Sequence, residues 1–168
     1  MARVRTTAKQ ADILDSVRDR LIERIDDWSE TSCIVADEPN PLKFPPSDQF
    51  GVVSPTEGVF PDGMFAGGGE VTLTEETGFL VTAYVRHTLD QNGRLEEALL
   101  STERGLLTHY KWQILKALLE DAWEPGNSTN EFLRDQLSPV SCSAPAIVSD
   151  KYVGLSVRFK TVFDWDLS

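Results

Sequence analysis

The side chains best suited to catalysis or metal binding are few in this sequence, and their spacing matches no common site. The two histidines, His87 and His109, belong to no H-x-x-x-H or H-E-x-x-H pattern, which would place metal ligands on one helix face. The two cysteines, Cys33 and Cys142, are far apart, and neither lies in a C-x-x-C pair. We therefore expect free thiols, no metal site and no cofactor.

Other motifs that could bind a ligand or carry a nucleophile are incomplete. Asp90–Gly93 resembles part of a calcium loop, but the first and last ligand positions would be Thr88 and Leu99, which lack the required carboxylates. Gly67–Gly69 precede no Lys-Ser or Lys-Thr and lead toward a predicted strand, so they do not form a phosphate loop. No serine lies in a G-x-S-x-G turn. We expect no catalytic residues and a protein that is not an enzyme.

Length and charge narrow the class of protein further. The 168 residues predict one domain spanning residues 1–168. With 16 basic and 27 acidic side chains, the net charge is −11, which argues against tight binding to phosphate backbones or to anionic membranes. No apolar run approaches the roughly 20 residues of a membrane-spanning helix. The polar, basic first ten residues do not resemble a signal peptide, so we expect a protein of the reducing cytoplasm.

The N-terminal third predicts a helix followed by short strands. Apolar residues recur at steps of three and four over Ala8–Ser29, which predicts an amphipathic helix. Cys33–Val35 is a short strand candidate, and the prolines of Asp37–Ser47 predict a loop. Phe50–Val53 and Gly58–Phe60 are predicted to be extended.

The middle of the chain predicts a hairpin followed by a long helix. Gly78–His87 alternates as a strand, with Glu70–Thr74 extended before it, and a long hairpin tip is expected over Phe60–Val71. Arg94–Trp123 carries a helical stripe, and Gly105 in its middle predicts a kink or a break into two helices.

The C-terminal region predicts a loop and then the longest strand. One or two helical turns are expected over Glu131–Leu137, and Ser138–Pro145 is predicted to be a loop. From Val153 to Leu167 the apolar residues are odd-numbered, which predicts a half-buried antiparallel strand of about 15 residues, roughly 50 Å long. A strand of that length must either bend across the sheet or reach outside its own subunit. The fold class expected is α+β: a mixed or antiparallel sheet flanked by an N-terminal helix and a long central helix, with a long C-terminal strand.

This order of elements resembles the tail terminator (tail completion) proteins of long-tailed bacteriophages and of phage-derived gene-transfer particles. The segments that carry the resemblance are Ala11–Trp28, Cys33–Val35, Phe50–Pro55, Met64–Gly69, Gly78–Arg86, Leu89–Asp90, Gly105–Leu107, Ile114–Leu118 and Val157–Trp165. The sequence departs from the family in the Asp37–Ser47 loop and in Glu124–Pro145, which bear on contacts between subunits.

The resemblance implies a structural protein of the virion, located at the junction of tail and neck and assembled in the host cytoplasm. It implies a homohexameric ring that caps the tail tube protein and contacts the head-side connector or stopper protein. DNA would pass through the lumen without sequence-specific contact, and an acidic lumen would repel its phosphates. No membrane partner is implied.

The segments best suited to contacts between subunits are a glycine-rich tip and the last strand, because strands can be added to a neighbour's sheet. The residues predicted to lie in this assembly interface are Asp62, Met64, Phe65, Gly67, Gly68, Gly69, Phe159, Phe163 and Trp165. Two alternatives remain open at this point. One is another phage neck or tail component, such as a head-completion or tube-like protein, and the other is a small cytosolic α/β enzyme or regulatory domain.

Overall fold

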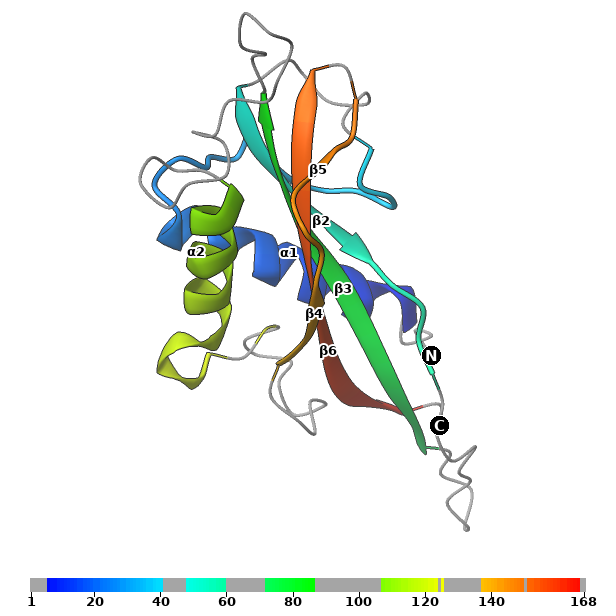
Figure 1. Ribbon diagram of the computed structural model, residues 1–168. Coiled ribbons are helices and arrows are strands. Elements are labelled where there is room, and N and C mark those ends of the chain that lie inside the picture. The colour runs from blue at the N-terminus through cyan, green and yellow to red at the C-terminus, as the bar shows by residue number, and fades with distance from the viewer. Residues whose placement is uncertain are drawn as a thin grey trace, which may run out of the picture.

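The computed structural model describes residues 6–40, 48–59, 72–86, 107–123, 125, 137–149 and 151–166. Within them the chain forms an α+β fold with two α-helices and a mixed sheet of six strands (Figure 1). The elements are α1 (Thr6–Arg24), β1 (Cys33–Val35), β2 (Gln49–Pro55), β3 (Thr72–Arg86), α2 (Leu107–Leu119), the short 3-10 helix η3 (Glu120–Ala122), β4 (Ser138–Cys142), β5 (Ala146–Ile147) and β6 (Tyr152–Asp166).

The sheet is ordered β1-β2-β3-β6-β4, and β5 also pairs with β6. β1 runs parallel to β2, and all the other pairs are antiparallel. The predicted hairpin is confirmed, since β2 pairs with β3 from Gln49↔Val85 to Pro55↔Phe79. β3 and β6 pair over fifteen positions, from Thr72↔Asp166 to Arg86↔Tyr152. The length of β6 is therefore matched by a strand of the same chain, and its pairing does not need a neighbouring subunit.

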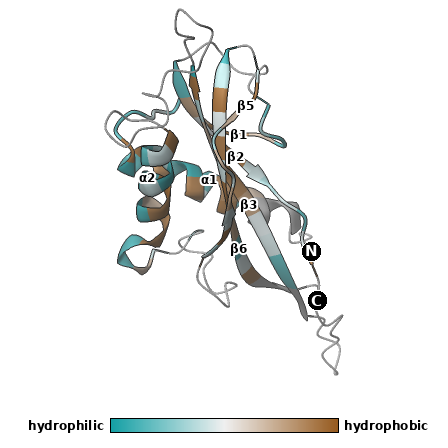
Figure 2. Ribbon diagram, in the orientation of Figure 1, coloured by the Kyte–Doolittle hydropathy of each residue, from teal (hydrophilic) through white to brown (hydrophobic). Residues whose placement is uncertain are grey.

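Both helices cover one face of the sheet, α1 over β1 and β2, and α2 over β3 and β6. The alternation predicted for the two long strands is confirmed where side chains are described, because Val81, Val157 and Phe159 are all buried on this face. Phe79 stacks on Phe159 with ring centroids 5.3 Å apart. Figure 2 shows the hydrophobic residues gathered along the middle of the sheet and on the helix sides that meet it.

A second, smaller apolar cluster lies on the opposite face of the sheet. Phe50 stacks on Tyr84 at 4.9 Å and meets the edge of Tyr152 at 5.2 Å. The Tyr84 hydroxyl donates to the carbonyl oxygen of Pro39 at 2.6 Å, so the start of the proline-rich loop is held over this face. Burial raises the pKa of Tyr84 to about 12, which keeps its hydroxyl protonated as a donor at neutral pH.

Several predicted boundaries need correction. The first helix was expected to continue to Ser29, but it ends at Arg24, where the turn-favouring pair Asp26-Asp27 follows. Trp28 is nevertheless buried, because its ring stacks on Tyr110 of α2 with centroids 5.5 Å apart.

The prediction of a loop over Ser138–Pro145 is wrong. Ser138–Cys142 is strand β4, paired with β6. Pro139 is tolerated because β4 lies at the end of the strand order, where a missing amide hydrogen breaks no ladder, and the register shifts between Pro139 and Ser141.

Two other expected elements are only partly described. Of the long central helix expected over Arg94–Trp123, the structure describes α2 at Leu107–Leu119 and the turn that follows, and residues 94–106 lie outside the described residues. Of the turns expected over Glu131–Leu137, only Leu137 is described, and it is buried.

The core position of Phe159 predicts a large loss of stability on truncation. Phe159→Ala removes a fully buried ring and its stacking contact with Phe79. The free energy of unfolding is therefore expected to fall by about 3–5 kcal/mol in urea denaturation. The control is Val140→Ala on β4, where the side chain is 48% exposed and the expected change is below about 0.5 kcal/mol. Equal effects of the two substitutions would contradict the burial of Phe159.

Candidate functional site

The described residues contain no group of three or more His, Cys, Asp or Glu side chains arranged to hold a metal ion. His109 lies on α2, where its ring stacks on Trp112 with centroids 6.1 Å apart. The other histidine, His87, lies outside the described residues. His109 thus stacks on a neighbouring aromatic ring of α2 and belongs to no such group among the described residues.

Both thiols are free, and both are poor nucleophiles. Burial raises the pKa of the Cys33 thiol to about 12, with Arg18 opposing and Asp19 adding to that rise. Burial also raises the pKa of Cys142, and the charge of nearby Lys111 partly opposes it. Since the thiolate is the reactive form, neither cysteine is activated for nucleophilic catalysis at neutral pH.

A surface pocket of about 190 Å³ lies between α2 and the end of α1. Its lining residues are Arg24, Trp112, Gln113, Lys116, Ala117 and Glu120. The ammonium of Lys116 lies 5.0 Å from the centre of the Trp112 ring, which is 56% exposed. Pockets that enclose small metabolites are usually about 300–1,000 Å³, so this depression is too small to bury one.

The predicted interface residues separate into three groups. Asp62, Met64, Phe65 and Gly67–Gly69 lie outside the described residues. Phe163 and Trp165 lie on β6, opposite Glu75 and Leu73 of β3. Phe159 lies in the core with no exposed area, so we no longer include it among the residues that contact a neighbour.

The backbone around Phe163 and Trp165 forms a two-stranded arm, which we define as Thr72–Glu75 paired with Phe163–Asp166. β2 covers β3 only from Phe79 to Val85, with one further bridge between Val59 and Glu76. β4 covers β6 only from Val157 to Lys160. Among the described residues, the arm therefore has no third strand on either side, and β3 is seen to extend past the helices in Figure 1.

Such an arm is about 13 Å long at about 3.4 Å per residue. A two-stranded ribbon alone in water is marginally stable, and it becomes stable when a further strand or surface packs on it. The arm is therefore the part of the sheet whose stability would rise most if a partner packed on it.

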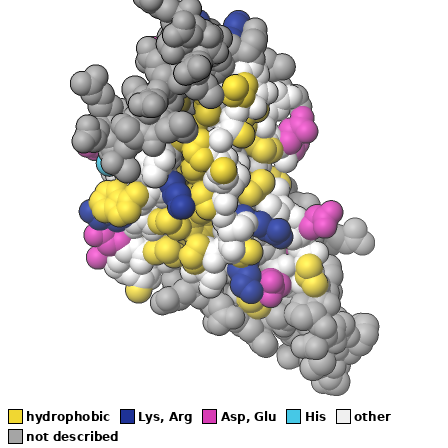
Figure 3. Space-filling model, viewed as in Figure 1, with side chains coloured by type: hydrophobic (Ala, Val, Ile, Leu, Met, Phe, Trp, Pro, Cys, Tyr) yellow, Lys and Arg dark blue, Asp and Glu magenta, His cyan; other side chains and the backbone are white. Residues whose placement is uncertain are grey.

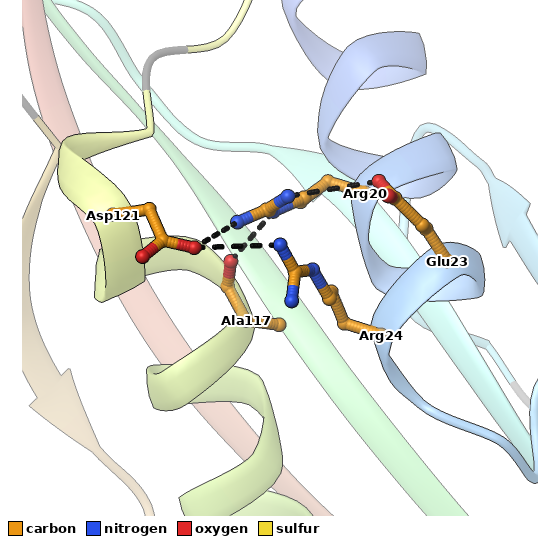
Figure 4. A network of polar contacts seen from close by, with 5 residues as sticks. All are labelled: Arg20, Glu23, Arg24, Ala117 and Asp121. Atoms are coloured by element: carbon orange, nitrogen blue, oxygen red, sulfur yellow. Dashed lines mark hydrogen bonds and ion pairs between the residues drawn. The ribbon is translucent and has the colours of Figure 1, made fainter.

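A polar network joins α1 to the end of α2 (Figure 4). Arg20 is 8% exposed; its Nε donates to the Ala117 carbonyl oxygen at 3.0 Å, and its guanidinium lies 3.6 Å from Glu23 and 3.9 Å from Asp121. Arg24 also reaches Asp121, at 3.4 Å.

This network holds an unusual backbone. Asp121 and the residue after it, Ala122, have φ values of 60° and 49°, in the left-handed region that side chains with a Cβ disfavour. The two arginines hold Asp121 in place, and Arg20 also satisfies a carbonyl in the last turn of α2. The network thus fixes the angle between the two helices, and its role is structural.

Sequence reasoning missed both this network and strand β4. Arg20 and Asp121 are about a hundred positions apart, and no local pattern links them. In β4 the alternation of Ser138, Val140 and Cys142 was a usable signal, but the two prolines at 139 and 145 favoured a loop.

Comparison with known proteins adds no family assignment. No protein-family model matches the chain, and no curated protein matches it. Among the described residues, the helices are too short or too polar to cross a membrane.

The buried arginine predicts an asymmetric effect of two matched substitutions. Arg20→Met keeps the aliphatic stem and the helix propensity but leaves the Ala117 carbonyl unsatisfied, so the free energy of unfolding is expected to fall by about 1–3 kcal/mol. Arg24→Met removes a half-exposed ion pair and is expected to cost about 0–1 kcal/mol. Denaturant unfolding of both variants is the measurement, and a larger loss for Arg24→Met would contradict the assignment of the buried position to Arg20.

Proposed function

We propose that this chain is the subunit of a tail terminator ring of a long-tailed bacteriophage. Six copies would cap the tail tube protein and present the opposite side of the ring to the head-side connector or stopper protein. DNA would pass through the lumen without sequence-specific contact. The protein would act as a structural part of the virion, without catalysis or a cofactor, and would assemble in the host cytoplasm.

The observation that carries the proposal is the two-stranded arm, which extends beyond the other paired strands of the sheet. Fifteen paired positions join β3 to β6, and the last four of them extend beyond the strands and helices that form the core. A ring subunit can use such an extension to contact its neighbour. The predicted tip, residues 62–69, lies outside the described residues and precedes Thr72 of the arm in the sequence.

The order of the elements supports the same proposal. A helix, a short strand, a hairpin, a second helix and a long last strand occur in the order that the family resemblance implies, with the short strands β4 and β5 added before the last one. The proposal retains the long central helix of the family, of which Leu107–Leu119 is described, and the long C-terminal strand.

Charge is compatible with a DNA channel. The net charge of −11 gives a ring of six copies a strongly negative surface, which disfavours adhesion of DNA during its passage. Proteins that hold DNA need clustered Lys and Arg, and this composition lacks the required excess.

Electron microscopy and sedimentation of the purified chain test the proposal. We expect ring-shaped particles of six 18.7 kDa subunits with a central channel, formed by the chain alone or on isolated tail tubes. A stable monomer or dimer that forms no ring in either setting would contradict the proposal. If such a monomer also showed a ligand-dependent shift in melting temperature, it would favour the enzyme class.

Variants of the tip, tested in the same assay, show which segment supports the ring. Deletion of residues 62–69 is expected to abolish rings, and replacement of the same residues by a Gly/Ser segment of equal length is the matched control for loop length. If the deletion left rings intact, the tip would not be a contact, although the ring itself would stand. Circular dichroism of each variant shows that the fold is retained.

A further inference from the structure

The two edges of the sheet differ sharply in charge. The strand order places β1 at one end of the sheet and β4 at the other, and β5 lies beside β4 on the same flank of β6. Within the described residues, neither β1 nor β4 has a strand on its outer side. The segment that ends in β1 and its loop, residues 11–40, contains nine acidic and three basic side chains, for a net charge of −6. Residues 137–162, which contain β4, β5 and most of β6, contain one acidic and three basic side chains, for a net charge of +2.

We define the basic edge as β4 and β5 with the cations beside them, which are Lys111, Lys151, Arg158 and Lys160. Lys111 projects from α2 on the helix side, close enough to act electrostatically on Cys142 of β4. Arg158 lies on β6 opposite Ser141 of β4, and its side chain is exposed. Cations therefore lie near β4 on both faces of the sheet.

The basic edge also exposes apolar side chains. The large hydrophobic residues that it leaves in solvent are Val140, Ile147 and Val148, which are 45–59% exposed. Figure 3 shows hydrophobic side chains along the middle of this face with Lys and Arg side chains among them. An edge strand with exposed apolar residues is a surface that proteins normally cover.

We define the acidic edge as β1 with the carboxylates that flank it, which are Asp15, Asp19, Asp37 and Glu38. Asp15 and Asp19 lie on α1, where both act electrostatically on Arg18. Arg18 and Asp19 act in turn on Cys33 of β1. Asp37 and Glu38 follow β1 directly and are exposed. Carboxylates therefore flank β1 from the helix side and from the loop that follows it.

We infer that copies of this chain associate head to tail, with the basic edge of one copy packed against the acidic edge of the next. The inference rests on the proposed ring and names the surfaces that close it. Opposite charges attract across such a contact, and the exposed valines and isoleucine of the basic edge lose solvent contact in it. Because the two surfaces differ, the contact is heterologous, and a heterologous contact closes into a ring when its rotation allows.

The charge pattern disfavours the symmetric alternatives. A two-fold dimer through the basic edge would bring Arg158 and Lys160 close to their own copies, and one through the acidic edge would do the same for Asp15 and Asp37. Like charges placed directly opposite each other oppose association. The mixed contact instead brings cations toward carboxylates. Asp19 already pairs with Arg18 at 2.7 Å and Lys160 with Glu76 at 3.5 Å. Lys111 and Arg158 are therefore the main cations of the contact, and Asp15 and Asp37 are its main carboxylates.

Charge-reversal variants test the inference. Lys111→Glu with Arg158→Glu places two carboxylates on the basic edge and cancels the net charge of its four cations. Asp15→Lys with Asp37→Lys places two ammonium groups on the acidic edge and cancels the net charge of its four carboxylates. Each variant alone is expected to associate at least about tenfold more weakly than the wild type in sedimentation velocity at low salt. The controls change net charge equally but away from both edges: Arg86→Glu with Lys116→Glu, and Glu57→Lys with Glu120→Lys. They are expected to associate like the wild type.

Mixing the two edge variants is the decisive step. In an alternating ring, half of the contacts join two unchanged edges, and in the other half the introduced carboxylates meet the introduced lysines. The mixture is therefore expected to recover the wild-type particle although neither variant forms it alone. Failure of the mixture to recover, with both variants folded by circular dichroism, overturns the inference. Wild-type rings that persist in both edge variants overturn the edge assignment and leave the ring intact. A wild type that forms no ring, alone or on tail tubes, overturns the inference together with the proposed function.

Discussion

The antiparallel pairing of β3 with β6 is the interaction that positions everything else in the protein. Its register places Phe79 beside Phe159 under the helices and Tyr84 opposite Gly154 on the other face, so one ladder builds both apolar clusters. A Cβ at position 154 would lie 3.0 Å from the Tyr84 ring and 2.8 Å from Val148, so the close approach needs a glycine. A slip of one residue would turn Arg158 and Lys160 into the core, which fixes the register strongly. The helices, the short strands and the arm all take their places from this pair.

The same pair gives the molecule two parts with different requirements. Over Phe79–Val85 and Val153–Phe159 it is covered by helices or further strands, and its side chains are largely buried. Over the arm it is covered by no other described strand. A sheet that extends beyond the hydrophobic core fits the proposed ring subunit, in which the arm would be covered by a neighbouring copy. In the proposed ring, the division of charge between the basic and acidic edges sets the direction of those contacts, and the net charge of −11 opposes non-specific association of the copies.

The sequence predicted the parts of the fold that depend on local pattern. The alternation of β6 and β3 and the helical stripe of α1 follow from side chains that one element buries by itself. Prediction from the sequence failed where contact with a residue distant in the chain determines the local structure. Pro139 favours a loop unless β6 is there to pair with, and Arg20 has no local reason to be buried without Ala117. Phe159 could have been assigned correctly, because the alternation that predicted its strand already placed it on the same buried face as Val157. The edge charges became visible only when the strand order separated β1 from β4.

Hydrogen exchange of backbone amides tests the central claim, that the arm is an element completed by assembly. It should be measured on the isolated chain and on the assembled ring, comparing Thr72–Glu75 and Phe163–Asp166 with Phe79–Val85. The account predicts fast exchange of the arm in the isolated chain, slow exchange of the central segment, and strong slowing of the arm on assembly. Arm amides that are as protected as the centre in the isolated chain, or that exchange unchanged in the ring, would contradict it.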